Sequence, residues 1–517
     1  MKPILESAPA ISVMTRQDAK SIILQILAEE WPLSAKDVYN RLRARHGPHI
    51  TYQGVHKILG QLVLEDAVSL ENKRYALRLD WIRGLRKFGE TTEKKYLEQD
   101  VRKPYLEVGV GYSVEPDAFM AGKEAAAKAL AQIKHGKPLQ LTLVFTSSVY
   151  ESAYERLSEG VRAVTRKAPL AGCSTFGEIA NRPLTKSVVV MIFAADKEDF
   201  SAQTICLPVL PEQYHTGDFK ETAAELQRQI RESGRTPDFG ILLLPGYTKT
   251  NNLSTVAPAL LKQLTVKSPL SFPLTGGIAG DDWHFDRNVL FYESKIYTDY
   301  LVLIAIRTRL KFGIAVKHSY APVSANKFKV RMKDGLISEL AKIEHGKPGK
   351  WRPCAEVYLK ETGISSMYFE EVVPFMKEVI TQNKALPLKN VNNNLLSFPF
   401  GIKGTSILFQ NMIVDGDVVQ VMRTSTSELE AAPSAVLREA INKAGIHIPV
   451  SALFFSCSAF ECILSNQNRN EIAALRKGEF KSLPVGGFYG AGEVCPFSYP
   501  QASGTALAIV FGNELKG

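Results

Sequence analysis

The chain has 517 residues, of which 45% are hydrophobic and 22% are charged, and it carries a formal net charge of +10. This length predicts three or four folding units, and the composition excludes an extended disordered chain or a fibrous repeat. Six cysteines without a CxxC pair exclude a disulfide framework and a zinc ribbon. The longest apolar stretch, residues 187–195, is half the length that crosses a bilayer, so we expect a cytoplasmic protein without a membrane segment.

Residues 1–14 lack hydrophobic periodicity and contain two prolines, which predicts a flexible N-terminus. Residues 15–79 then show three segments with helical spacing of apolar residues, and Ser34 and Thr51 are placed to cap the second and third. Two short alternating segments follow on either side of the polar tip 71–74, which predicts a hairpin. This order resembles a winged helix-turn-helix domain, in which the third helix lies in the DNA major groove and the hairpin is the wing.

Positive charge is concentrated in the same region. Residues 1–104 hold 18 basic and 13 acidic side chains, so about half of the net positive charge lies in one fifth of the chain. That concentration favours contact with DNA phosphates. We expect backbone contacts from Arg41, Arg43, Lys73 and Arg74, and an outward face of the third helix formed by Tyr52, Gln53, His56 and Lys57, with Gln53 and His56 placed to read bases. A winged helix that contacts another protein, with a solvated basic face, is the alternative.

Residues 80–104 are predicted to form a connector helix. An apolar stripe of Trp81, Ile82, Leu85 and Phe88 continues at helical spacing within a charged sequence. The stripe either joins two copies of the chain into a homodimer or packs on the next domain, and both interpretations stay open.

The remainder of the chain contains a repeated pattern. Residues 169–178 and 484–493 share Pro, Gly, Gly and Glu at identical offsets, and residues 273–282 keep the proline, the first glycine and an acid. Each copy follows an apolar strand, a small polar loop and an amphipathic helix, and each precedes another strand. The recurring strand-helix-strand-strand unit predicts an α/β fold with mixed β-sheets layered with helices.

These segments resemble the FIST N and FIST C domains, named for F-box and intracellular signal transduction proteins. The resemblance covers roughly residues 105–517, and we expect a FIST N-like sensory domain at 105–360 and a FIST C-like domain at 361–517. It implies an intracellular module that binds small ligands, amino acids among them, and that is often joined to a signalling output domain. The chain departs from the family pattern at 459–461, where the family has an arginine, and before Thr505, where the family favours a histidine.

The glycine motifs and the polar loops supply candidate ligand contacts. Glycines let a ligand approach the backbone, helix N-termini and hydroxyls favour an anionic group, and a carboxylate favours a cation. A cleft with one end that favours an anion and another that favours a cation suits a zwitterion such as a free amino acid. The hydroxyls are those of Ser147, Ser148, Thr248, Ser456 and Ser458. The predicted ligand contacts are Gly172, Cys173, Ser174, Thr175, Gly177, Glu178, Gly276, Gly277, Asp281, Ser456, Cys457, Gly487, Phe488, Gly490, Gly492 and Glu493. In the alternative interpretation the glycines allow close packing and the acids cap turns.

Enzyme chemistry has little support in the sequence. Cys457 follows a strand and precedes a helix, but no histidine is recognisably paired with it. Asp281, Asp282 and His284 lie close together without a second group of metal ligands, and no phosphate-binding loop or dinucleotide fingerprint is present. We therefore expect no enzyme activity, no metal and no cofactor. The sequence predicts a sensor of a small ligand coupled to a DNA-binding head, a one-component transcriptional regulator; the alternative is a signalling adaptor that makes protein–protein contacts.

Overall fold

The chain divides into two compact units, residues 1–102 and 103–517. The computed structural model describes residues 19–46, 50–100, 104–246, 256–284, 286–364, 380–384, 386–392, 395–409, 413–495, 501–502 and 504–516. The predicted flexible N-terminus, residues 1–14, lies outside these ranges. Among the helices in the described ranges, none is both long and apolar enough to cross a membrane.

The first unit packs three helices against a small antiparallel sheet. The elements are α1 (Ala19–Glu29), β1 (Leu33–Ser34), α2 (Ala35–His46), α3 (Tyr52–Leu64), β2 (Val68–Glu71) and β3 (Arg74–Leu77), with sheet order β1-β3-β2. Ile23, Val38 and Leu59 are fully buried at the centre. Both predicted caps are confirmed, because the Thr51 hydroxyl accepts from the Gly54 amide at 3.1 Å and the Ser34 hydroxyl accepts from the Asp37 amide at 3.2 Å. The predicted hairpin around 71–74 is also present.

Helix α4 (Leu79–Asp100) follows this sheet directly. Of the predicted apolar stripe, Trp81 packs against the buried core of the first unit, whereas Ile82 is 42% exposed. Part of the stripe therefore anchors the helix to its own unit. Pairing of two copies through α4 stays a prediction.

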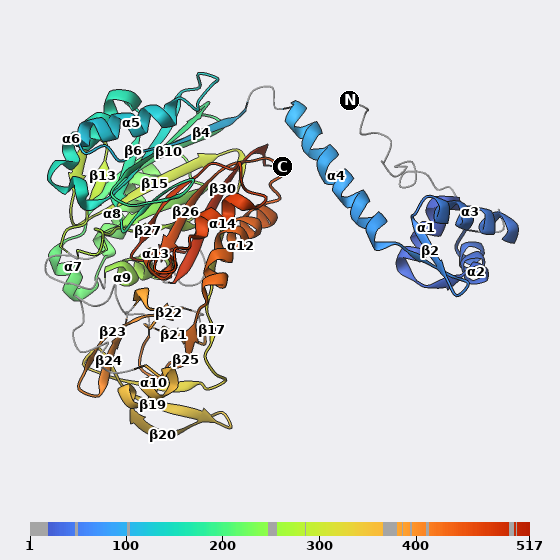
Figure 1. The fold of residues 1–517 in the computed structure, drawn as a ribbon. Helices are drawn as coiled ribbons and strands as arrows, with labels where there is room; N and C mark the ends of the chain where they lie inside the picture. Colours follow the sequence, from blue (N-terminus) through green and yellow to red (C-terminus); the bar gives the residue numbers. More distant parts are fainter. Residues whose placement is uncertain are drawn as a thin grey trace. The chain divides into compact units, whose positions relative to one another are not determined.

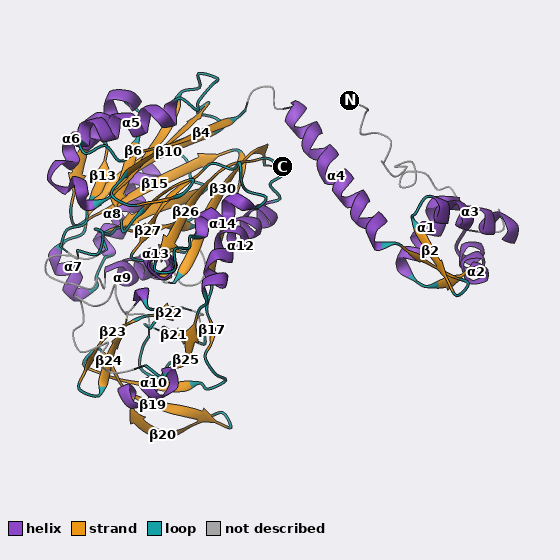
Figure 2. Ribbon diagram, viewed as in Figure 1, coloured by secondary structure: helices purple, strands orange, loops and turns teal. Residues whose placement is uncertain are grey.

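Among the described residues, the second unit contains three six-stranded sheets and one nine-stranded sheet (Figures 1 and 2). The first six-stranded sheet is formed, in order, by β14 (Lys295–Tyr297), β13 (Leu290–Tyr292), β6 (Leu170–Ser174), β5 (Leu139–Thr146), β9 (Val188–Ala195) and β4 (Leu106–Ser113). The second is formed by β10 (Phe200–Pro208), β15 (Tyr300–Thr308), β11 (Phe239–Leu244), β12 (Leu274–Ile278), β28 (Glu493–Val494) and β29 (Gln501–Ala502). The third is formed by β16 (Leu310–His318), β30 (Thr505–Leu515), β26 (Pro449–Cys457), β27 (Val485–Gly490), β7 (Glu178–Ala180) and β8 (Pro183–Leu184).

Each of these sheets contains the same four-stranded core. The orders β4-β9-β5-β6, β10-β15-β11-β12 and β16-β30-β26-β27 share one pattern, two antiparallel pairings followed by one parallel pairing. The helices that cover them are α5 (Ala118–Leu130) and α6 (Tyr154–Thr165) on the first, α8 (Lys220–Glu232) and α9 (Val256–Lys262) on the second, and α12 (Thr426–Ala444) on the third. The predicted α/β fold with mixed sheets and a repeated unit is confirmed in three copies.

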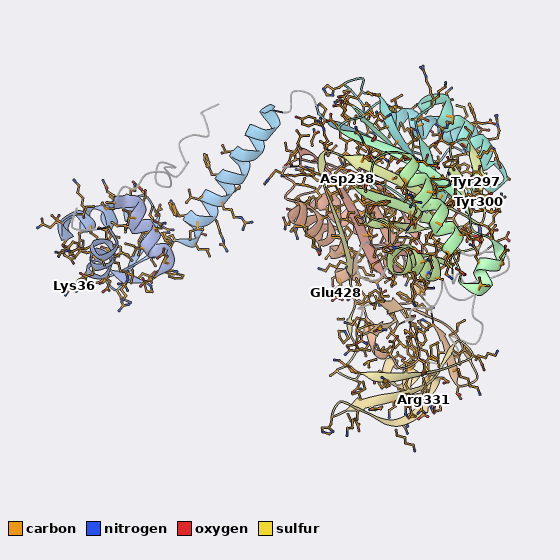
Figure 3. All side chains as sticks on the ribbon, turned by 180° about the vertical axis from the view of Figure 1, so that it is seen from behind. Lys36, Asp238, Tyr297, Tyr300, Arg331 and Glu428 are labelled. Atoms are coloured by element: carbon orange, nitrogen blue, oxygen red, sulfur yellow. The ribbon has the colours of Figure 1, made fainter. Side chains whose placement is uncertain are left out.

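The two remaining strands of each sheet come from a different repeat. β13 and β14 of the second repeat complete the first sheet, β28 and β29 of the third complete the second, and β7 and β8 of the first complete the third. Where the chain crosses from β14 to β15, the rings of Tyr297 and Tyr300 lie 4.5 Å apart (Figure 3). The three repeats thus exchange strand pairs in a closed cycle.

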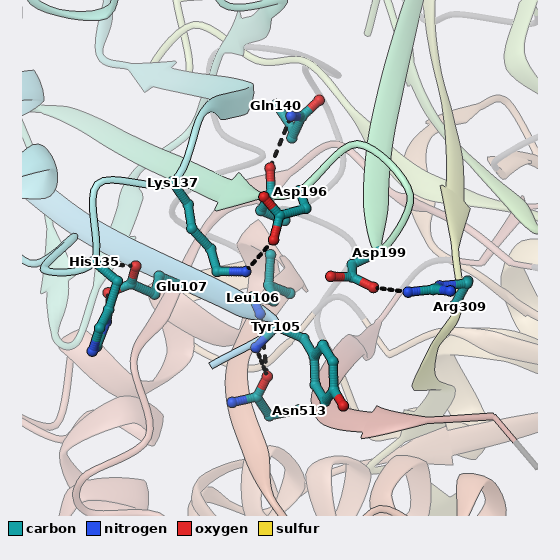
Figure 4. A network of polar contacts seen from close by, with 11 residues as sticks. Tyr105, Leu106, Glu107, His135, Lys137, Gln140, Asp196, Asp199, Arg309 and Asn513 are labelled. Atoms are coloured by element: carbon teal, nitrogen blue, oxygen red, sulfur yellow. Dashed lines mark hydrogen bonds and ion pairs between the residues drawn. The ribbon is translucent and has the colours of Figure 1, made fainter. Parts of the chain in front are cut away.

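The inner faces of the three sheets meet in one apolar core. Phe145 of the first sheet lies 4.9 Å from Phe488 of the third, and Phe239 of the second lies 6.2 Å from Phe511 of the third, measured between ring centroids. The first and last strands of the second unit are also joined, since the Asn513 side-chain oxygen accepts from the Tyr105 and Leu106 amides at 2.8 and 3.1 Å (Figure 4). Burial of apolar side chains in this core is the main contribution to the stability of the unit.

The nine-stranded sheet is inserted between β16 and α12 of the third repeat. Its strands are β17 (Ala321–Pro322), β18 (Phe328–Lys333), β19 (Leu336–Glu344), β20 (Lys347–Pro353), β21 (Leu388–Asn390), β22 (Leu396–Ser397), β23 (Pro399–Lys403), β24 (Ser406–Phe409) and β25 (Val418–Arg423), with α10 (Cys354–Thr362) packed against it. Arg331, labelled in Figure 3, lies on this sheet. Its guanidinium is 3.9 Å from the Trp351 ring centroid. β18 pairs with β25, so one sheet spans residue 360, where the sequence suggests a domain boundary.

Candidate functional site

The motif glycines lie where parallel strands approach closely. A Cβ atom on Gly172, Gly276 or Gly487 would stand 1.9, 2.1 or 1.7 Å from a carbonyl oxygen of the neighbouring strand. Gly276 and Gly487 also have φ angles of +145° and +154°, which side-chain-bearing residues rarely adopt. Close strand pairing therefore accounts for glycine at these three positions, and a ligand contact at any of them stays a prediction.

Other residues of the motifs are also buried in the sheets. A Cβ on Gly277 would meet the Phe488 ring at 2.6 Å, and one on Gly490 would meet a carbonyl oxygen at 2.8 Å. The Ser174 hydroxyl accepts from the Val289 amide at 2.9 Å. The remaining predicted contacts in these segments, Cys173, Gly177 and Gly492, lie in or beside the same strands, and Cys173 is fully buried. These residues hold the repeats together.

The two motif glutamates are buried and bonded to hydroxyls of their own chain. Glu178 accepts from Thr175 at 2.6 Å and from Ser187 at 2.5 Å, and Glu493 accepts from Thr505. Burial raises the pKa of Glu178 to about 8, with the Asp282 carboxylate adding to the shift, and burial raises the pKa of Glu493 well above its usual range. Neither side chain has exposed surface.

The second repeat departs from the other two. In register, Glu178 faces Phe488 and Glu493 faces Gly277, whereas the residue facing Cys173 at the equivalent position is Leu290. The acid predicted for this copy, Asp281, lies elsewhere: its carboxylate accepts from the backbone amides of residues 286 and 287 at 2.8 and 3.1 Å. The second repeat therefore has no buried carboxylate at this position.

Asp282 occupies the anion position expected at Ser147 and Ser148. One carboxylate oxygen accepts from the Ser147 hydroxyl at 2.6 Å, the Ser148 amide at 2.6 Å and the Ser148 hydroxyl at 2.7 Å. His284 Nδ1 lies 3.2 Å from the same Ser148 hydroxyl. A side chain of the protein thus takes the three donors predicted for a ligand, and the equivalent Thr248 lies outside the described residues. Within the described ranges, no three His, Cys, Asp or Glu side chains are grouped to hold a metal ion.

Cys457 does not have the surroundings of an activated nucleophile. It is buried at the end of β26, and burial raises the pKa of its thiol to about 12, with the Glu493 carboxylate adding to the shift. A catalytic thiol requires a lowered pKa instead.

A cavity of about 210 Å³ opens where β7 and β8 of the first repeat join the sheet of the third. Its walls come from β8, from α13 (Ser458–Ser465), from the start of α14 (Glu471–Lys477) and from β27. The lining residues are Pro183, Leu184, Thr185, Glu461, Leu464, Ser465, Arg469, Asn470, Glu471 and Tyr489. We call this space the Glu471 cavity.

Glu471 is the most unusual group in that cavity. It has no exposed surface, and neither of its carboxylate oxygens has a hydrogen-bond partner among the described residues. Burial raises its pKa to about 8, and the nearby hydroxyls of Ser456 and Tyr489 counter that shift in part without reaching good hydrogen-bond geometry. The Ser456 hydroxyl is likewise buried without a partner in the described chain. Unsatisfied buried polar groups are costly, so such a pair indicates a place for a ligand or water.

Sequence reasoning missed Glu471. Asn470 caps α14 by accepting from the Ala473 amide at 2.9 Å, and an acid in the first turn after such a cap is ordinary. None of the predicted ligand contacts lines this cavity, although Ser456, Cys457 and Glu493 interact with Glu471 from behind its wall. No local signal marks the residues at 183–185 that close it.

The predicted DNA-contacting residues lie on the surface of the first unit. Gln53, His56 and Lys57 are exposed at the start of α3, and the Tyr52 ring stands edge-on to His56 with centroids 5.4 Å apart. This places one polar and aromatic face at the N-terminal end of the helix.

The basic residues differ in how free they are to contact a partner. Arg43, Lys73 and Arg74 are exposed, the latter two at the turn between β2 and β3. Arg41, by contrast, is paired with Glu30 at 2.7 Å, so its charge is partly neutralised before any partner arrives.

The fold defines a three-repeat α/β protein with a buried acidic cavity, and comparison with known families identifies it further. Residues 140–341 match the FIST N domain and residues 355–496 match the FIST C domain. The chain therefore carries both domains, which are sensor domains of signal transduction.

Relatives of this chain include proteins of archaea and bacteria. An uncharacterized protein of Methanocaldococcus jannaschii is 22% identical over 302 residues, 57% of this chain and 56% of that protein. Uncharacterized proteins of two Mycobacterium tuberculosis strains are 24% identical over 398 residues, 76% of this chain and 95% of theirs. The chain thus covers little more than half the length of the archaeal relative.

Proposed function

We propose that the protein is a cytoplasmic, non-enzymatic sensor of a small ligand, an amino acid among the candidates, coupled to a DNA-binding head as a one-component transcriptional regulator. The observation that carries the sensing part is the Glu471 cavity, with a fully buried carboxylate that lacks a partner in the described chain. Pockets with a few convergent polar groups and a perturbed pKa are the default binding sites of proteins.

The position of the cavity suggests how a ligand acts. Residues 183–185 belong to the FIST N segment, and residues 461–489 belong to the FIST C segment. A ligand that contacts both stabilises the arrangement in which β7 and β8 are seated on the third sheet. Binding shifts a conformational equilibrium only through such a difference in affinity between two arrangements.

The output is proposed to be DNA binding by residues 15–79, acting as a winged helix-turn-helix joined to the sensor by the connector predicted at 80–104, which includes most of α4. The order of three helices and a β-hairpin, the exposed face of α3 and the basic turn at 73–74 support this assignment. In this geometry α3 enters the major groove and the turn contacts the backbone.

A gel-shift titration at several salt concentrations tests the DNA-binding part. Gln53→Ala with His56→Ala is expected to reduce the preference for one sequence, while Lys73→Ala with Arg74→Ala weakens binding to all sequences and lowers the salt slope by about 2. Lys123→Ala, on an exposed site of the second unit, is the matched charge control. Absence of DNA affinity in the unaltered protein contradicts the assignment.

A signalling adaptor is the second candidate, because the first unit exposes apolar side chains. Leu64 is 86% exposed and Leu70 is 49% exposed. Exposed apolar side chains of this size are available for contact with a protein partner. Co-purified polypeptides without nucleic acid favour the adaptor over the regulator.

A further inference from the structure

The Glu471 cavity has the chemistry of a cation site. We propose that it binds a small protonated primary amine through the Glu471 carboxylate, and that each molecule bound releases one proton to solvent. This inference rests on the proposed function and specifies the ligand class of the same site.

The walls provide an apolar body and an anionic end. Pro183, Leu184, Leu464 and the Tyr489 ring supply apolar surface, while Glu461 and Glu471 supply carboxylates. A volume of about 210 Å³ corresponds to roughly seven water molecules at about 30 Å³ each. A molecule of roughly five to ten non-hydrogen atoms fits that space.

The polar atoms match an ammonium group better than an anion or a neutral hydroxyl. An ammonium group has three donors and no acceptor, and Glu471, which lines the cavity, has two carboxylate oxygens without partners in the described chain. The one basic side chain among the described lining residues, Arg469, is paired with Glu430 at 3.1 Å. A ligand anion would oppose ionisation of Glu471, would meet Glu461 beside it, and would find the arginine already engaged.

Binding of a cation is coupled to ionisation of Glu471. The charged or titratable groups that face it are Glu461 on α13, Arg469 before α14, Tyr489 on β27, and Cys457 and Glu493 at the ends of their strands. With a pKa of about 8, the empty carboxyl is mostly protonated near neutral pH. The ammonium pairs with the carboxylate, so the carboxyl proton leaves to solvent as the ion pair forms and the charge within the cavity stays balanced.

Calorimetry with n-butylamine tests this proposal, with n-butanol as the neutral analogue and butyrate as the anionic one. In phosphate buffer the affinity for n-butylamine is expected to rise about tenfold per pH unit below pH ~7.5 and to level off near pH ~8. Glu471→Gln keeps the shape of the side chain and is expected to weaken n-butylamine binding at least about tenfold. Glu479→Gln, an exposed glutamate paired with Arg438, is the matched control and leaves binding unchanged.

A second variant separates this inference from the sensor proposal. Ser465→Trp, at an exposed position of the rim, places a large ring in the cavity and is expected to abolish binding. Three results would overturn the amine assignment. They are an affinity for n-butanol equal to that for n-butylamine, an affinity of Glu471→Gln for n-butylamine equal to that of the unaltered protein, and no binding of n-butylamine. If a wider metabolite panel then yields a ligand that Ser465→Trp excludes, the sensor proposal still stands; if the panel yields none, the sensor proposal fails as well.

Discussion

Substitution of Gly487 by alanine tests whether the motif glycines serve strand packing. The added Cβ would stand 1.7 Å from the Phe454 carbonyl oxygen, whereas real Cβ contacts are essentially never under 3.0 Å. The strands β26 and β27 must therefore separate by roughly 1.3 Å at this point, in a core that packs like a crystal. The variant must also adopt a φ of +154°, which alanine disfavours.

The expected cost follows from these two effects. Overpacking of a core costs about 1–3 kcal/mol, and a disfavoured backbone conformation costs about 1–3 kcal/mol. Together they predict a loss of about 2–6 kcal/mol in the free energy of unfolding, a large fraction of the about 5–15 kcal/mol typical of folded proteins. Gly276→Ala is expected to behave similarly, because it combines a contact at 2.1 Å with a φ of +145°. Gly172→Ala has the contact at 1.9 Å without a positive φ, so we expect only the overpacking cost of about 1–3 kcal/mol.

Guanidinium chloride unfolding followed by circular dichroism measures the loss as a lower transition midpoint. Gly478→Ala is the matched control, since its φ of −99° suits alanine and its nearest neighbour would be 3.7 Å from the new Cβ. The control is expected to stay within about 0.5 kcal/mol of the unaltered protein. Equal midpoints for Gly487→Ala and Gly478→Ala would refute the packing argument.

Three further predictions concern polar groups. Asn513→Ala removes the acceptor of two backbone amides and is expected to cost about 2–4 kcal/mol in chemical unfolding, whereas Asn513→Asp keeps the acceptor and costs less; equal losses would count against the contact. Burial raises the folded-state pKa of Glu471 from 4.5 to about 8, so its contribution to stability is complete below pH ~4.5 and is lost as pH rises toward about 8. The free energy of unfolding of Glu471→Gln, measured at several pH values, should therefore rise relative to that of the unaltered protein by on the order of 4 kcal/mol between pH ~4.5 and pH ~8. A difference between the two proteins that does not change with pH would contradict the raised pKa of Glu471. Asp282→Ala removes three hydrogen bonds at Ser147 and Ser148 and is expected to lower the thermal midpoint and to speed amide exchange at residue 148; unchanged exchange would refute the role of Asp282.

Features with local causes were predictable from the sequence. The caps at Ser34 and Thr51, the turn at 72–73 and the three strand-helix repeats each depend on residues within a few positions of one another. Capping and turn chemistry act over such short separations, so the pattern of residues carries the information.

The exchange of strand pairs was not predictable in the same way. β7 pairs with β27 across some three hundred residues, and nothing near residue 178 indicates which sheet it joins. For the same reason the repeated pattern suggests Asp281 as the third acid, although the register places Leu290 at the position that faces Cys173. The Glu471 cavity depends on that exchange, because its wall at 183–185 comes from the first repeat.

The claim that a ligand occupies the Glu471 cavity is tested most directly by an experimental structure of the full chain soaked with n-butylamine above pH 8. The account predicts density in the cavity with the amine nitrogen within hydrogen-bonding distance of the Glu471 carboxylate. A cavity that stays empty, or density only elsewhere on the protein, would contradict it.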